Sequence, residues 1–208
     1  MSNVPFKERV AQVAIIHAPL YKQVFVDYEY LFCSDAFKNR PFYILACRED
    51  NYRHLIGVNT SMSASAFFAA CMDGSLTAND FDFIKKHRSE KEVKGSVRKK
   101  IQILPLFVSM IGQNLVAQED FSKNNVSCAF ATTDCKFTVG FVEWGKSRPM
   151  TLLNGNELDW NKSEMIDLVL RRPAGAEKFD TLILGNNQLL QKYMASISDL
   201  VADNLIDH

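Results

Sequence analysis

The sequence predicts an α+β fold in which N-terminal and middle helices pack on an antiparallel β-sheet and a C-terminal helix follows. The chain has 208 residues, of which 47% are hydrophobic and 15 are Phe, so it can bury a substantial core. Helical and strand-like patterns form separate blocks along the chain, whereas a parallel sheet requires their regular alternation. The length is that of one domain with an appendage.

The N-terminal part predicts two helices and then two strands. Residues 5–18 carry a partly amphipathic stripe, which Pro19 is expected to end or kink, and a second short helix is predicted over 20–27. Aromatic and branched residues then predict strands over 28–33 and 41–47, with a polar loop between them.

The middle part predicts a strand followed by a helix. Residues 53–59, RHLIGVN, are typical of a third strand. Residues 63–72 predict a helix, with Ser61 or Ser63 as its N-cap and Asp73–Gly74 closing it.

The second half predicts most of the sheet and the last helix. After a polar connection over 118–125, strands are predicted over 126–132, 137–144, 150–153, 166–170 and 179–184. The first two of these strands are expected to form a hairpin and the last two to pair with each other. Gly185–Asn186 is expected to cap a C-terminal helix with an apolar stripe that runs from Leu189 to Leu205.

Composition and motifs exclude several classes of function. Basic and acidic residues number 24 each, so any patch for nucleic acid must be local. No apolar run approaches the ~18 residues of a membrane helix, and the N-terminus lacks the apolar core of a signal peptide, so we expect a cytoplasmic protein without membrane contact. The sequence has no P-loop, GxGxxG, HExxH or GxSxG motif.

The five cysteines give no sign of a metal site. None of Cys33, Cys47, Cys71, Cys128 and Cys135 stands in a zinc-like spacing, and no pair of histidines lies near them. We interpret them as buried thiols, and we predict neither a metal nor another cofactor.

His54 is the strongest candidate for acid–base chemistry. In the predicted strand it shares one face with Ile56 and Val58, and an imidazole titrates near neutral pH. The alternative is a half-buried histidine that bonds to a backbone carbonyl.

The segment 85–100 is the one strongly charged stretch. It holds eight Lys or Arg against two Glu, a local net charge of +6. Residues 94–96 resemble a helix start, and Lys94 and Arg98 are four residues apart, so together they predict a site for an anion, with phosphate favoured. The next cations are Lys99 and Lys100. The alternative is an ordinary solvated surface.

A third group of candidates consists of Lys123, Thr132 and Thr151. Hydroxyl groups at the end of a strand, together with a nearby ammonium group, can orient a substrate. The alternative is that the threonines cap turns.

Several sequence blocks in a fixed order resemble a known family. They are FYILACREDNYRHLIGVNT, SASAFFAACMDGSLTANDFDF, KGSVRKKIQILP, EDFSKNNVSCAFATTDCKFTVGFV and PMTLLNG. This order is similar to that of the barnase–EndoU–colicin E5/D–RelE-like nuclease domains of phages and mobile elements, over roughly residues 25–155. The resemblance implies a domain over 1–155 with a helical lead-in, and 156–208 is expected to complete the same unit.

The resemblance also implies an activity, which is metal-independent cleavage of RNA by attack of the ribose 2′-hydroxyl on the adjacent phosphate. Carried onto this sequence, His54 is the expected acid or base, and Lys94 and Arg98 stabilise the phosphorane. The expected substrate-binding residues are Lys99, Lys100, Lys123, Thr132 and Thr151.

The sequence is also compatible with a second, non-catalytic function. A non-catalytic interaction protein, such as a host-takeover or anti-defence factor, would bind a protein or nucleic acid through the basic segment or the C-terminal helix. This alternative predicts an exposed apolar patch around Leu190, Met194 and Ile197, and the same helix could also form a homodimer. A protein partner or inhibitor is expected in either case.

Overall fold

The centre of the molecule is a closed ring of β-strands. The computed structural model describes residues 4–123 and 126–206. Seven strands follow one another around the ring in the order β1-β2-β6-β5-β4-β3-β7, and the β1–β7 pairing closes it, while β8 extends the sheet from β7. The strands are β1 (Tyr28–Ser34), β2 (Tyr43–Leu45), β3 (Val116–Lys123), β4 (Val126–Thr133), β5 (Phe137–Trp144), β6 (Lys146–Asn154), β7 (Ser163–Pro173) and β8 (Thr181–Leu184).

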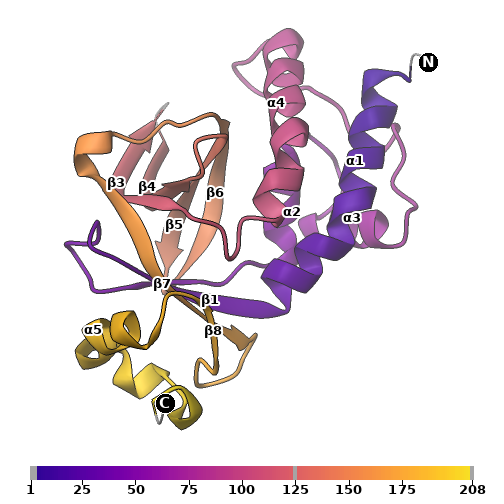
Figure 1. Cartoon of the computed structure of the whole chain (residues 1–208). Coiled ribbons are helices and arrows are strands. Elements are labelled where there is room, and N and C mark those ends of the chain that lie inside the picture. The colour runs from indigo at the N-terminus through magenta and orange to yellow at the C-terminus, as the bar shows by residue number, and fades with distance from the viewer. Residues whose placement is uncertain (1–3, 124–125, 207–208) are drawn as a thin grey trace.

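Helices lie in two separate groups (Figure 1). Helices α1 to α4 lie together beside the strands β3 to β6, and α5 lies at the other end of the molecule, below β1 and β7. Their bounds are α1 (Phe6–Tyr21), α2 (Glu49–Ile56), α3 (Ala64–Met72), α4 (Glu90–Val108) and α5 (Asn187–Ile197). A π-helical segment (Lys22–Val26) follows α1, and short 3₁₀ turns occur at Trp160–Lys162, Ser198–Leu200 and Asp203–Leu205.

The α+β class is confirmed, but the simple antiparallel sheet is not. The pairing of β2 with β6 is parallel, whereas the other strand pairs are antiparallel. The ring closure was also not predicted, because it joins β1 to a strand more than 100 residues later in the chain. Residues 163–173 therefore complete the ring that the first 155 residues begin.

Both faces of β1 are buried, and they face different clusters. Tyr30 and Phe32 belong to the main core, together with the helices α1 to α4. Leu31 and Cys33 belong to a second cluster with α5. Aromatic stacking holds the main core together, since Phe130 stacks on Tyr43 and on Phe141 with ring centroids 4.5 and 4.7 Å apart.

The apolar stripe of α5 is covered by the chain itself. Leu190 and Ile197 are buried against the cluster that contains Leu31, and Met194 is half-buried there. The exposed apolar patch that a partner or a homodimer would need at this helix is therefore not present. The Asn186 side chain caps α5 by accepting a hydrogen bond from the Leu189 N–H, as predicted.

Several element predictions were wrong. Residues 53–59 form the end of helix α2 and a turn, and not a strand. Helix α1 continues through Pro19 to Tyr21, so the proline does not end it. Helix α4 begins at Glu90, so residues 94–96 lie inside it and are not a helix start. The predicted polar connection over 118–125 is mostly strand β3, and its residues 124–125 lie outside the described part.

Other local predictions were confirmed. Ser63 caps α3 by accepting a hydrogen bond from the Ala66 N–H at 3.1 Å. The strands β4 and β5 form the expected hairpin, and β7 pairs with β8. Four of the cysteines are buried, but Cys135 is exposed in the β4–β5 hairpin loop. Within the residues that the structure describes, no helix is long and apolar enough to cross a membrane.

Candidate functional site

Helix α2 holds His54 at the surface. Its inner face buries Tyr52, Leu55 and Ile56, so the intervening His54 is left on the outer face. The helix begins where the Arg48 N–H donates to the Asn51 side chain, and it ends at Gly57, which has a φ of +86°.

Lys100 of α4 lies across the end of α2. Its Nζ donates to the backbone carbonyl of His54 at 2.6 Å. A Cβ atom at Gly57 would stand 2.9 Å from the Cδ of Lys100, closer than van der Waals contact. The left-handed backbone therefore favours glycine at this position, and a larger residue would also shift the flexible end of the Lys100 side chain.

These residues line a pocket of about 260 Å³. Its charged or titratable side chains are Arg53, His54, Lys85 and Lys100, residues 57–60 form one wall, and Met150 of β6 forms another. None of the lining residues is acidic. The Arg53 guanidinium is held in place because it donates to the Met62 carbonyl at 2.8 Å.

The cations of the pocket are uncompensated. Within 4–123 and 126–206, no ion pair joins a carboxylate to Arg53, Lys85 or Lys100. Burial, followed by repulsion from Lys85 and Arg88, lowers the pKa of Lys100 to about 8. Lys100 is half-buried, and it lines the pocket together with Lys85. A bound anion would relieve the repulsion between these cations.

The surroundings of His54 favour the neutral form of its imidazole. Partial burial, followed by repulsion from Arg53, Lys100 and Lys85, lowers the pKa of His54 below its ordinary value of 6.5. The side chain is nevertheless accessible from solvent. It is therefore available as a proton acceptor next to a site for an anion.

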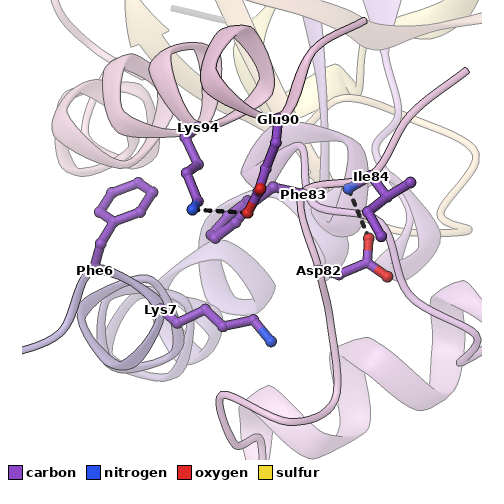
Figure 2. Close-up of a pocket in the computed structure, with 7 residues that line it drawn as sticks. All are labelled: Phe6, Lys7, Asp82, Phe83, Ile84, Glu90 and Lys94. Atoms are coloured by element: carbon purple, nitrogen blue, oxygen red, sulfur yellow. Dashed lines mark hydrogen bonds and ion pairs between the residues drawn. The ribbon is translucent and has the colours of Figure 1, made fainter. Parts of the chain in front are cut away.

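The structure does not bring Lys94 and Arg98 into this pocket. Lys94 pairs with Glu90 at 2.7 Å and lies over the Phe83 ring, in a different hollow that faces α1 (Figure 2). The Arg98 guanidinium lies 5.0 Å from the ring centroid of Phe6. Both side chains point to the α1 side of α4, whereas Lys100 points toward α2.

The other predicted residues are dispersed. Lys99 lines a hollow of about 450 Å³ between α4 and β6, together with Arg88. Lys123 pairs with Glu157 at 2.6 Å. Thr132 is fully buried, and its hydroxyl has no hydrogen-bond partner within the described part of the chain. Thr151 is half-buried, with its methyl group against Gly140.

Two charged residues of the pocket, Arg53 and Lys85, were not predicted from the sequence. Arg53 stands next to His54, and in a strand it would have pointed to the opposite face. Lys85 lies at the beginning of the basic segment, whereas the anion site was predicted farther along that segment, at residues 94–96. If residues 49–56 had been predicted as a helix, Arg53 and His54 would have been placed in its last turn, beside the turn that follows.

No cluster of metal ligands occurs among the described residues, since no group of three or more His, Cys, Asp or Glu side chains could hold a metal ion there.

The fold and the site define an α+β domain with a histidine in a cationic, acid-free pocket. The chain belongs to the family described as phage-Barnase-EndoU-ColicinE5/D-RelE like nuclease4, whose family model matches residues 17–171. The match confirms the resemblance, and it extends past residue 155 to most of β7. Searches of curated proteins and of solved structures found no match.

Proposed function

We propose that this nuclease-family protein is an endoribonuclease that cleaves RNA by attack of a 2′-hydroxyl group on the adjacent phosphate, without a metal ion. The observation that carries the proposal is the pocket in which a neutral histidine stands among three uncompensated cations. A phosphodiester supplies the negative charge that Arg53, Lys85 and Lys100 lack in the protein alone.

His54 is the candidate base. In the first step the imidazole takes the proton of the 2′-hydroxyl, the 2′-oxygen bonds to phosphorus, and the bond from phosphorus to the 5′-oxygen breaks. The leaving oxygen needs a proton, and Lys100 is the candidate acid because its pKa is about 8. The products are a 2′,3′-cyclic phosphate and a 5′-hydroxyl end.

The cations stabilise the charge that develops on phosphorus. Arg53 is held by the Met62 carbonyl and so presents its remaining N–H groups in a fixed direction. Lys99 and Arg88 line the hollow beside α4 together with Glu92 and Glu157, so we assign them no phosphate. In this proposal Lys94 and Arg98 take no part in the chemical step, because they lie outside the pocket.

The test is cleavage of a single-stranded RNA by the purified protein in the presence of a chelator. We expect a cyclic phosphate at the new 3′ end and no cleavage of a 2′-deoxy oligonucleotide. His54→Gln should lower the rate at least ~100-fold, since acid–base groups contribute roughly 10²–10⁴-fold. His17→Gln is the matched control because His17 lies on α1 and does not line the pocket.

Two results would contradict the proposal. One is cleavage that requires an added divalent metal, and the other is undiminished cleavage by a folded His54→Gln protein. Salt-dependent RNA binding with no cleavage at all would favour the non-catalytic alternative, in which the basic segment binds a nucleic acid.

A further inference from the structure

Three hollows adjoin one another on the surface and mark out a path. The His54 pocket shares Asn59 and Thr60 with a second hollow of about 400 Å³. That hollow in turn shares Lys7 and Asp82 with a third one, of about 420 Å³. A chain molecule bound in the His54 pocket would cross the shared walls at Asn59 and Asp82 to reach the third hollow.

The path has a fixed geometry. Asn59 and Asp82 form a β-bridge, with N–O distances of 3.0 and 2.7 Å in the two directions. The Asn59 amide also donates to the Asp82 carboxylate at 2.8 Å. Because these two residues stand on the walls between the hollows, the bridge sets the spacing between the first hollow and the third.

The third hollow differs from the His54 pocket in its chemistry. Its lining includes Phe6, Phe83 and Ile84, and Phe6 stacks on Phe83 with ring centroids 5.4 Å apart. Its charges are balanced, since Lys7 and Lys94 oppose Asp82 and Glu90. Figure 2 shows these side chains around the hollow, with Lys7 facing the paired Lys94 and Glu90 across it.

This lining suits a flat, uncharged group that has an apolar face and polar edges. A phosphate would be repelled by the two carboxylates, whereas an unpaired nucleobase can pack on the apolar residues and use its edge donors and acceptors. The hollow between the two offers the hydroxyl of Ser61 and the side-chain amide of Asn79, whereas the Thr60 hydroxyl already donates to the Asp80 carbonyl. Because Asp80 and Asp82 also line this hollow, it suits the hydroxyls of a ribose rather than a phosphate.

We infer that the Phe6–Phe83–Ile84 hollow binds an unpaired base of the RNA strand whose phosphate lies in the His54 pocket, so that the substrate class is single-stranded RNA. This inference rests on the proposed function for its choice of ligand. It gives Lys94 and the exposed Ile84 a part in substrate binding, away from the reacting phosphate, while the buried Phe83 supports the Phe6 ring from behind.

The experiment measures binding of 2′-deoxy oligonucleotides, which the proposed reaction cannot cleave. One probe is a single strand that carries bases, and the other is an abasic strand with the same number of phosphates. Ile84→Glu alters the hollow without disturbing the core because Ile84 is 69% exposed. Ile16→Glu is the matched control, since Ile16 is 66% exposed on α1 and lines none of the three hollows.

We expect Ile84→Glu to raise the Kd for the base-carrying strand about tenfold and to leave the Kd for the abasic strand within about twofold. Ile16→Glu should change neither value. Phe6→Leu, which keeps an apolar side chain but removes the ring, should act in the same direction. The same sequence paired into a duplex should bind more weakly than the single strand.

An equal effect of Ile84→Glu on both probes, or no effect, would overturn the inference, and so would absence of binding by the unaltered protein. The two proposals fail separately. RNA cleavage with no selective effect of Ile84→Glu leaves the proposed function standing, whereas selective loss of base binding without any cleavage supports this inference and refutes the chemistry.

Discussion

At the scale of single residues, the set of cations in the pocket is decided by which side chains the fold brings together. The basic character of a residue is not sufficient to place it there. The basic segment supplies Lys85 and Lys100 to the pocket, and it sends Lys94 and Arg98 to the opposite side of α4. Residue type and spacing identified His54 as a candidate. Which cations of α4 reach the His54 pocket depends on the rotation of α4 about its own axis. That rotation is set by the burial of Val93, Val97 and Ile101.

A pH profile tests the two titrating groups. We expect kcat/KM for RNA cleavage to rise with pH through the pKa of His54, which lies below 6.5, because the base must be neutral. It should fall again near pH 8, where Lys100 loses its proton. Lys100→Arg should remove the alkaline limb, since a guanidinium stays protonated. An activity that keeps rising beyond pH 9 would exclude Lys100 as the acid.

At the scale of elements, α2 shows why part of the fold could not be predicted. The apolar residues Leu55, Ile56 and Val58 suggested a strand, and the helix is only eight residues long, so its periodicity is weak. Its end signals were nevertheless present in Glu49, Asp50 and Gly57. In contrast, the Ser63 and Asn186 caps precede clear apolar stripes, and both helix starts were predicted correctly.

Helix α4 offers an element-scale prediction. The Ser89 hydroxyl accepts a hydrogen bond from the Glu92 N–H, and the Glu92 carboxylate accepts one from the Ser89 N–H at 2.7 Å. Ser89→Ala should therefore lower the free energy of unfolding by about 1 kcal/mol, measured by urea denaturation. Ser65→Ala, at an exposed position inside α3, should change it by less than about 0.5 kcal/mol. Equal effects would show that the cap contributes nothing.

At the scale of the whole molecule, the closure of the ring is the feature that no local pattern could reveal. Glu29 of β1 stands opposite Arg172 of β7, and the two form a buried ion pair at 2.8 Å. Lys146 of β6 contacts the same carboxylate. These residues are far apart in the sequence, so only the complete sheet places them together.

The buried pair is expected to be sensitive to the loss of one partner. Glu29→Gln leaves the Arg172 guanidinium buried without a counter-charge and should lower the free energy of unfolding by about 3 kcal/mol. The double change Glu29→Met with Arg172→Met should recover most of this loss, because an apolar pair needs no charge compensation. Denaturation midpoints of the three proteins give the comparison. A loss below about 1 kcal/mol for Glu29→Gln would indicate that solvent reaches the guanidinium.

The β1–β7 pairing also affects when the protein can fold during its synthesis. Glu29 and Arg172 are 143 positions apart, so β1 leaves the ribosome well before β7, and the ring cannot close until β7 has been made. Contacts this distant slow folding, because loop closure must precede any gain from pairing. A nascent chain that stops before residue 163 keeps an open sheet edge on β1. Completion of the ring is thus tied to the synthesis of β7.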